Sequence, residues 1–365
     1  MNATMTPCSP RFNRRWRRNL LPGTLPMGIA IWGLFTMGLI VALTVAPRLA
    51  PAAEVNVYSY RQPFLIKPLF DAFTAETGIR VKVVFSQKGI TERIRREGRN
   101  SPADLLFTVD IGRLHDAVTA GILQPVDTPV LRANVPAPYR QPEGLWYGLT
   151  VRARVVLASK ARVPRGALRT YEDLTGEKWR GRICTRSSQH VYNVAMLASM
   201  IANHGERAAQ DWAAGVLENL ARKPQGNDRA QVRAIKEGEC DLALVNHYYL
   251  GVMMEKPEQR PWAEAVYPIF PNQEGRGTHV NISGAAVTRH APHKAEAIRL
   301  LEYLTEEKAQ ALYAGQNFEY PVNPRVELAP LLKSWGPFKA DPLNLAKVAE
   351  QRSLAIRIFD RVGFP

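Results

Sequence analysis

The sequence predicts an α/β protein made of two lobes that are joined by a hinge. Short apolar strands alternate with amphipathic helices over residues 55–119, and the same alternation returns over residues 182–270. Since strands that alternate with helices form sheets with helices on their faces, each stretch predicts one α/β lobe. Two apolar segments, 147–157 and 281–288, can cross between the lobes, and we therefore expect mixed sheets and a hinge.

Three strands and three helices are predicted in the first lobe. The strands are expected at residues 55–58, 81–85 and 105–109. The first helix has apolar side chains four residues apart from Leu65 onward and ends at Gly78, and the second covers residues 91–97. Asp110 can cap the third helix, because its carboxylate accepts a hydrogen bond from a free backbone N–H of the first turn.

The second lobe follows the same pattern. Its predicted strands are residues 182–185, 242–245, 266–270 and 280–287. Its predicted helices are residues 192–203, 207–222 and 228–235. Asp228 is expected to cap the last of these helices and Gly238 to end it. Ligands of such sheets bind beyond the carboxyl ends of the strands, so we expect a site in the cleft between the lobes.

These assignments set the expected limits of the domains. Lobe 1 comprises residues 53–150 and about 285–325, and lobe 2 comprises residues 151–284. Residues 326–365 form a C-terminal helical segment that the pattern assigns to neither lobe.

The first 52 residues differ in composition from the rest. A head with five arginines precedes an uncharged apolar run at residues 27–45, and Ala50 and Ala52 follow in an A-x-A arrangement. This order predicts a secretory signal peptide over residues 1–52, and therefore export. The apolar run is also long enough to span a bilayer, so an uncleaved membrane anchor at 27–45 is the alternative.

Composition and charge narrow the classes of function. The hydrophobic share of 46% and the charged share of 22% indicate a globular protein. Removing residues 1–52 takes away six arginines and no acidic residue, so the formal net charge falls from +15 to +9. A basic remainder favours anionic ligands or surfaces. No run of Lys and Arg with interleaved aromatics follows Arg48, which argues against nucleic acid as a partner.

Two cysteines, Cys184 and Cys240, follow the predicted cleavage site. An even number in an exported protein allows one disulfide, and two unpaired thiols in the core are the alternative.

Histidines and sequence motifs do not point to an enzyme. The histidines His190, His204, His247 and His279 are scattered, without an HExxH pattern. No Gly-x-Ser-x-Gly motif and no Gly-rich phosphate loop occurs. We expect His247, beside Tyr248, to be exposed to solvent rather than to bind a metal.

Three tyrosines follow strands of the second lobe. Tyr248 and Tyr249 come directly after strand 242–245, and Tyr192 lies seven residues past Thr185. Packing at strand ends is the simpler interpretation, since Tyr buries its ring and keeps its hydroxyl in water. The alternative is a ligand site, because all three phenols are expected at one wall of the cleft.

Three phenols together can hold a trivalent cation. A phenol is protonated at neutral pH, but the field of a hard cation favours the charged phenolate. Hard cations prefer oxygen ligands, and three phenolates would neutralise Fe(III). A small bidentate anion such as carbonate can fill two of the remaining positions and requires basic neighbours.

The chain resembles the periplasmic ferric-iron-binding proteins of bacterial ABC importers over most of residues 55–324. The segments that carry the resemblance are 57–63 (VYSYRQP), 73–79, 100–114, 146–156, 186–193 (RSSQHVYN), 222–232, 246–251 (NHYYLG), 271–284 and 317–322. It implies a two-lobed periplasmic-binding-protein fold of type II with transferrin-like chemistry. It also implies a monomer in the periplasm that is not an enzyme, captures Fe(III) and delivers it to an inner-membrane ABC permease.

Site residues can be carried over from the family one by one. Its shared iron ligands match Tyr192, Tyr248 and Tyr249. Several members also supply a His-Tyr pair after the first strand, and that pair falls on Gln62 and Pro63 here. The subgroup with three tyrosines and a bound carbonate therefore fits better.

Four side chains are candidates to hold the anion. Arg61 and Gln62 lie on the loop after the first strand, and Arg152 and Arg113 are further candidates. The alternative function is a binding protein of the same fold for a small organic or oxyanionic solute, and a periplasmic enzyme with a cleft metal is a third class.

Overall fold

The computed structural model describes residues 53–365. The predicted signal peptide at 1–52 and the alternative anchor at 27–45 lie outside the described residues. Within the part that the structure describes, no helix is both long and apolar enough to cross a membrane.

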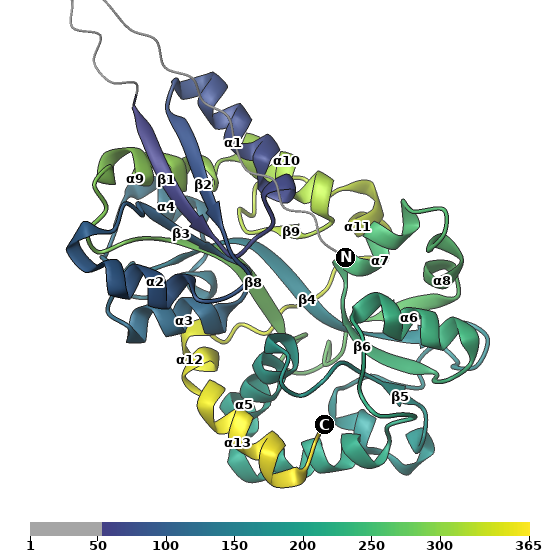
Figure 1. The fold of residues 1–365 in the computed structure, drawn as a ribbon. Coiled ribbons are helices and arrows are strands. Elements are labelled where there is room, and N and C mark those ends of the chain that lie inside the picture. The colour runs from purple at the N-terminus through teal and green to yellow at the C-terminus, as the bar shows by residue number, and fades with distance from the viewer. Residues whose placement is uncertain (1–52) are drawn as a thin grey trace, which may run out of the picture. The chain divides into compact units, whose positions relative to one another are not determined.

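The first lobe contains the strands and helices that its sequence pattern predicts, and a further short helix at residues 129–134 that was not predicted (Figure 1). The strands are β1 (Glu54–Ser59), β2 (Arg80–Phe85) and β3 (Leu105–Thr108). The helices are α1 (Pro63–Thr77), α2 (Ile90–Glu97), α3 (Ile111–Thr119) and α4 (Pro129–Asn134). Strand β1 pairs in parallel with both β2 and β3. The Asp110 carboxylate accepts a hydrogen bond from the backbone N–H of Gly112 at 2.8 Å, which confirms the predicted cap.

Strand β4 (Tyr147–Ser159) is the long crossing strand, and it is buried along its whole length. Its first half pairs antiparallel with β8 (Val280–Val287) and with β9 (Tyr320–Pro321). Its second half pairs antiparallel with β6 (Leu242–Asn246) and β7 (Val266–Ile269). The main strand order is therefore β2-β1-β3-β8-β4-β6-β5, a mixed sheet in which β4 and β8 join the two lobes.

The second lobe confirms most of the predicted elements. They are β5 (Ile183–Cys184), α5 (Val191–Glu218) and α6 (Asp228–Glu237), together with β6 and β7. Two short helices were not predicted, α7 (Tyr248–Met254) and α8 (Arg260–Glu264). Gly205 breaks α5 with φ 84° and ψ 171°, so the two predicted helices meet there. The predicted cap of α6 was wrong by one residue. Asn227 is the cap and accepts from the N–H of Ala230, whereas the Asp228 carboxylate binds arginines.

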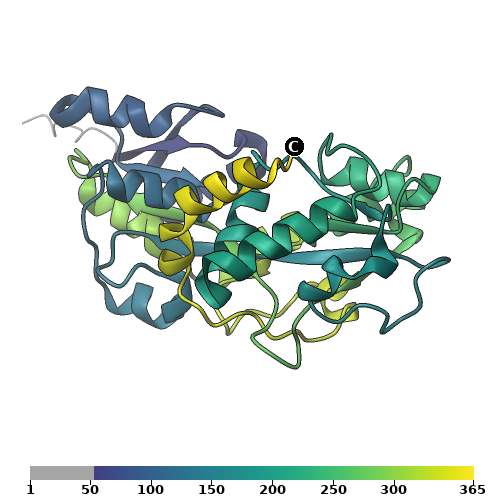
Figure 2. The same cartoon turned by 90° about the horizontal axis from the view of Figure 1, so that it is seen from below.

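The chain after β8 is mainly helical. It contains α9 (Lys294–Tyr303), α10 (Glu307–Asn317), α11 (Pro330–Ser334), α12 (Leu345–Glu350) and α13 (Arg352–Val362). Short 3-10 turns lie at Gly98–Asn100, Ala137–Tyr139, Glu172–Thr175 and Glu177–Trp179. Figure 2 shows α12 and α13 running along α5, and α12 also contacts α3. The C-terminal segment therefore contacts both lobes, and the numerical limits of the lobes remain a prediction.

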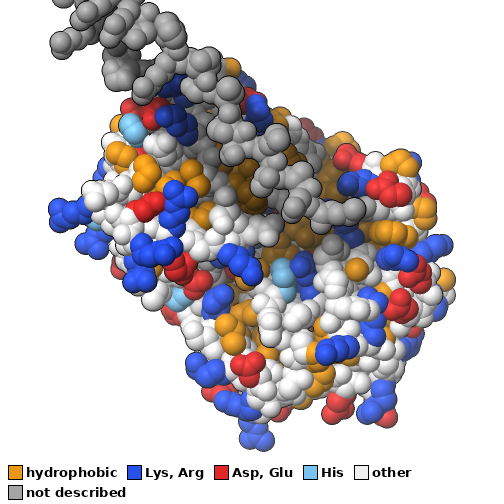
Figure 3. All heavy atoms as spheres, viewed as in Figure 1, with side chains coloured by type: hydrophobic (Ala, Val, Ile, Leu, Met, Phe, Trp, Pro, Cys, Tyr) orange, Lys and Arg blue, Asp and Glu red, His pale blue; other side chains and the backbone are white. Residues whose placement is uncertain are grey.

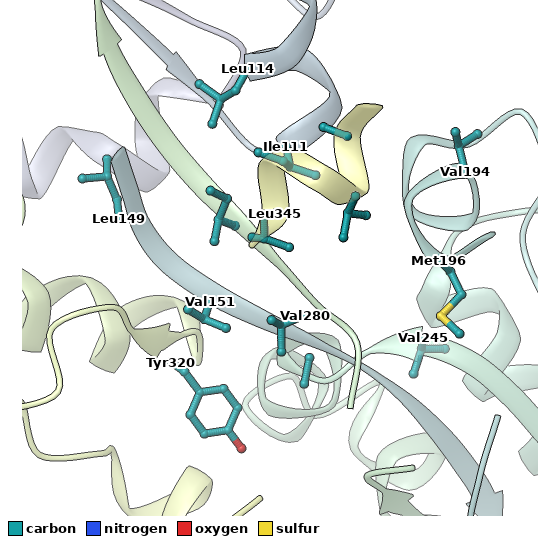
Figure 4. Close-up of a cluster of buried hydrophobic side chains, with 14 of the residues drawn as sticks. Ile111, Leu114, Leu149, Val151, Val194, Met196, Val245, Val280, Tyr320 and Leu345 are labelled. Carbon is teal, nitrogen blue, oxygen red and sulfur yellow. The ribbon is translucent and has the colours of Figure 1, made fainter. Parts of the chain in front are cut away.

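The core follows the crossing strands. Figure 4 shows Val151 of β4 and Val280 of β8 among buried side chains of other elements. These include Leu114 of α3, Met196 of α5 and Leu345 of α12. One buried layer thus runs through both lobes, because the strands that cross between them are buried along their whole length.

Cys184 and Cys240 form a disulfide with a Cα–Cα distance of 5.9 Å. The bridge joins the end of β5 to the residue just before Asp241 and β6. Of the two alternatives for this pair of cysteines, the structure has the bridge rather than two free thiols.

Candidate metal-binding cleft

A cavity of about 410 Å³ lies where the carboxyl ends of several strands meet. From the first lobe, its lining includes Tyr60, Arg61, Gln62, Phe64, Leu65 and Val109, which follow β1 and β3. From the second lobe, it includes Tyr192, Arg229, Tyr248, Tyr249, Val252 and Lys256, and Arg152 and Asn317 complete it. The expected position of the site, beyond the strand ends and between the lobes, is thus confirmed as the position of a cavity.

The structure brings the three predicted tyrosines together. Tyr192 lies in the first turn of α5, and Tyr248 and Tyr249 are the first two residues of α7. The hydroxyl oxygens of Tyr192 and Tyr248 are 3.2 Å apart. The rings of Tyr248 and Tyr249 stack, with centroids 4.4 Å apart and an angle of 28° between their planes. The simpler packing interpretation explains the stacked rings but not the convergence of hydroxyls from two helices in a cavity wall.

Strand pairing explains why residues so far apart in sequence meet. Strands β5 and β6 are parallel neighbours, with Ile183 opposite Leu242. The segments that leave their carboxyl ends therefore emerge side by side. One leads to the N-terminus of α5 and the other to the N-terminus of α7, and both helices begin with residues of the tyrosine cluster.

Burial raises the pKa of two of the three phenols, those of Tyr248 and Tyr249. The pKa of Tyr248 is raised well above its ordinary value, first by burial and then by the neighbouring Tyr192 and Tyr249. The pKa of Tyr249 is also raised, again mainly by burial. The Arg152 guanidinium, 5.6 Å from the centre of the Tyr192 ring, acts in the opposite direction on Tyr248. A charge is therefore costly on these phenols unless a cation compensates it.

A buried ionic network lies behind the tyrosines, and the sequence patterns missed it. The Asp228 carboxylate binds Arg154 at 2.9 Å and Arg186 at 2.6 Å, and it accepts a hydrogen bond from the backbone N–H of Asn246 at 3.0 Å. Arg154 also donates to the side chain of Asn193 at 2.7 Å. Both arginines lie within 6 Å of the Tyr192 ring, at 5.8 Å and 5.4 Å from its centre. The network thus holds the residues next to the tyrosines and leaves a net positive charge beside them.

His247 does not lie where its position in the sequence suggested. His247 was expected to be exposed, and that prediction was wrong, because the side chain is fully buried. Its Nδ1 accepts a hydrogen bond from the backbone N–H of Ala153 at 3.0 Å, and its ring packs on Tyr320 with centroids 4.6 Å apart. Burial lowers the pKa of His247 to about 4. The pairing of β4 with β6 places the residue in the core, which its polar neighbours in the sequence do not reveal.

His190 supports the first turn that carries Tyr192. Its ring nitrogen accepts a hydrogen bond from the backbone N–H of Tyr192 at 3.3 Å, and so it caps α5. Burial, and then the nearby Arg186 and Arg154, lower its pKa to about 3. Within residues 53–365, no three His, Cys, Asp or Glu side chains gather as a metal site.

Three of the four anion candidates line the cavity. Arg61 is buried, and its guanidinium binds Glu319 at 2.8 Å and Ser283 at 3.1 Å. Gln62 is exposed, and it makes no side-chain capping bond to α1. Arg152 is buried and donates to the carbonyl oxygens of Ile282, at 2.6 Å, and of Val109.

The fourth candidate, Arg113, is not among the residues that line the cavity. Its guanidinium packs over the Tyr60 ring, 4.4 Å from the centroid. Two cations that the sequence patterns missed, Arg229 and Lys256, do line the cavity. Lys256 lies two residues past the end of α7, so no helical spacing from Tyr249 could have indicated it. Of the described residues in the cavity wall, none is Asp or Glu.

Comparisons with known proteins agree with the arrangement. The family described as bacterial extracellular solute-binding protein matches residues 100–341. Iron uptake protein A1 of Synechocystis sp. is 45% identical over 314 residues, which cover 85% of this chain and 87% of that protein.

Two solved structures show the same fold. Ferric iron-binding protein A of Mannheimia haemolytica, in an open conformation, matches with TM-score 0.81 and 46% identity over 86% of this chain and 99% of that one. A Trichodesmium protein in complex with iron and citrate ligands matches with TM-score 0.83 and 45% identity over 86% of this chain and 100% of that one. These matches confirm the two-lobed α/β fold and the resemblance to ferric-iron-binding proteins. The chain belongs to the bacterial extracellular solute-binding proteins.

Proposed function

We propose that this chain captures Fe(III) in the cavity between its lobes and delivers it to an inner-membrane ABC permease. The ligands are Tyr192, Tyr248 and Tyr249. The observation that carries the proposal is the convergence of these three phenols, from the first turns of two helices, in one cavity wall. The named relatives, an iron uptake protein and two iron-binding proteins, support it.

The geometry of the phenols suits a small octahedral cation. With metal–oxygen distances of about 2 Å, adjacent ligands of an octahedral ion lie about 3 Å apart. The oxygens of Tyr192 and Tyr248 are 3.2 Å apart before any ion is bound. Little rearrangement is therefore needed for both to bind one ion, and the field of a trivalent cation favours the phenolate form that burial alone disfavours.

An anion completes the site in this proposal. Three phenolates balance the charge of Fe(III), so the positive charge of the cavity wall stays available for an anion such as carbonate. Gln62 and Arg152 are the first candidates to bind this anion, because the Arg61 guanidinium already forms an ion pair with Glu319. Arg229 and Lys256 provide further positive charge, and a cavity of about 410 Å³ leaves room for an anion larger than carbonate. We leave Arg113 out of the proposed site.

The proposal includes export and a transport role. The signal peptide at 1–52 would take the chain to the periplasm, where it would act as a monomeric carrier rather than as an enzyme. The alternative function is binding of an oxyanionic solute without a metal. The only observation that favours it is the positive charge of the cavity wall. Calorimetric titration with the anion in the absence and presence of Fe(III) separates the two, because only the iron site requires the metal.

The test replaces each tyrosine by phenylalanine, which keeps the ring and removes the oxygen. Ferric affinity should fall by orders of magnitude in Tyr192→Phe, Tyr248→Phe and Tyr249→Phe, and the visible phenolate-to-iron band should weaken or shift. Tyr303→Phe is the matched control, because the Tyr303 hydroxyl is buried without a hydrogen-bond partner and does not line the cavity. Wild-type colour and affinity in both Tyr248→Phe and Tyr249→Phe would sink the proposal.

A further inference from the structure

Phe64 is an apolar side chain in an unfavourable position. It is 68% exposed, while the other exposed large hydrophobic side chains of residues 53–365, Phe85, Val130 and Ile356, are 36% or 37% exposed. An aromatic ring is among the groups that gain most from leaving water. Phe64 also lines the cavity that holds the tyrosines, whereas the other three do not.

The backbone holds Phe64 firmly at this place. Pro63 occupies the first turn of α1, where its restricted φ suits a helix start. The neighbours on both sides are anchored, since Arg61 is bound to Glu319 and Ile66 is fully buried. The exposure of Phe64 is therefore a property of an ordered helix start and not of a loose segment.

The other wall of the cavity offers an apolar surface for this ring. Val252 of α7 lines the cavity and is half-buried. It lies four residues after Tyr248 and three after Tyr249, so it shares the helix face of both tyrosines. The cavity wall of the second lobe thus has an apolar residue next to the phenols, and the cavity wall of the first lobe contains Phe64 and Leu65.

We infer that Phe64 is the residue that retains bound iron: when the lobes close on Fe(III), its ring packs against Val252 and shields the phenolate oxygens from water. This inference rests on the proposed function. Exclusion of water has two effects. It strengthens the attraction between the cation and the phenolates, and it keeps competing chelators from the ion. Phe64 contributes no ligand atom, so it acts on the rate of iron loss and not on the ligand field.

The test measures the release of iron to excess EDTA by following the visible band in a stopped-flow instrument. Phe64→Ala should lose iron roughly tenfold faster, because it removes most of the apolar contact that burial of a phenyl ring provides. The position of the band should not change, because the ligands are intact. Phe85→Ala is the matched control, since Phe85 is an exposed phenylalanine of β2 outside the cavity wall, and it should release iron at the wild-type rate.

The possible outcomes separate the inference from the proposed function. A wild-type release rate in Phe64→Ala, with a circular dichroism spectrum and melting temperature like the wild type, overturns the inference alone. A shifted band in Phe64→Ala overturns it as well, since the ring would then be shaping the ligand geometry. Equal acceleration in Phe85→Ala would show a general effect of surface truncation and would overturn the inference as well. Absence of any visible band in the wild type overturns the proposed function and the inference together.

Discussion

Replacement of Asp228 by asparagine should destabilise the protein far more than a surface change of the same kind. Asp228 is fully buried and compensates two guanidinium groups, Arg154 at 2.9 Å and Arg186 at 2.6 Å. Asn keeps the size of the side chain, but it removes the only negative charge of this cluster and turns an amide N–H₂ toward one arginine.

The magnitude follows from the burial of the partners. Removing one partner of a buried ion pair leaves an uncompensated charge in a medium of low polarity and costs about 3–5 kcal/mol. Arg154 is 2% exposed and cannot recover this loss by turning to water. We therefore expect the free energy of unfolding of Asp228→Asn to fall by about 3–5 kcal/mol.

Denaturation of the iron-free protein by urea, followed by far-UV circular dichroism, measures this change. Asp71→Asn is the matched control, because Asp71 pairs with Lys67 at the surface, where both side chains are more than half exposed. That change should cost less than about 1 kcal/mol. A loss in Asp228→Asn no larger than in the control would refute the argument, and it would mean that the two arginines are solvated or compensated in another way.

Three further predictions concern the bridge, the buried histidines and the anion. Titration of denatured, unreduced protein should find no free thiol from Cys184 and Cys240, and replacing both by serine should cost about 2–5 kcal/mol. Burial lowers the pKa of His247 to about 4 and of His279 to about 3. Below about pH 6.5 these histidines are therefore protonated in the unfolded chain but not in the folded one. The free energy of unfolding should be highest at pH 7 and fall as the pH drops toward 4, by up to about 1.4 kcal/mol per pH unit for each histidine. A urea midpoint that stays constant from pH 7 to 5 would contradict this. Gln62→Ala should keep the visible band of the ferric protein but change its dependence on added bicarbonate, and an unchanged bicarbonate titration would remove Gln62 from the site.

The surface charge of the molecule illustrates the limit of composition as a guide. Figure 3 shows Lys and Arg side chains scattered across the visible face, with Asp and Glu side chains among them. Much of the net charge is therefore solvated surface charge. The cations relevant to the site are the few that line the cavity, and the net charge does not identify them.

Elements defined by local patterns could be predicted closely. Residues 280–287 form a strand with the predicted limits, and the strand is buried along its whole length. Gly78 and Gly238 end their helices with positive φ, 74° and 85°, which glycine adopts without strain. The crossing role of β4 also followed from the length and apolarity of residues 147–157. In each case a few neighbouring residues contain the physical cause.

The sequence by itself determined which residues carry the candidate chemistry: three tyrosines after strands of one lobe, and a loop with Arg61 in which Gln62 and Pro63 occupy the positions of the family's His-Tyr pair. Tertiary structure alone decided how they act. In the folded chain two phenol oxygens lie 3.2 Å apart, and Arg61 forms an ion pair with Glu319. His247 is buried against β4. Asp228, which was expected to cap a helix, pairs instead with Arg154, 74 residues away in the chain. The physical reason is the distance along the chain between the residues that interact. Apolar periodicity and capping depend on residues a few positions apart, whereas burial and charge compensation depend on partners that only the folded sheet brings into contact.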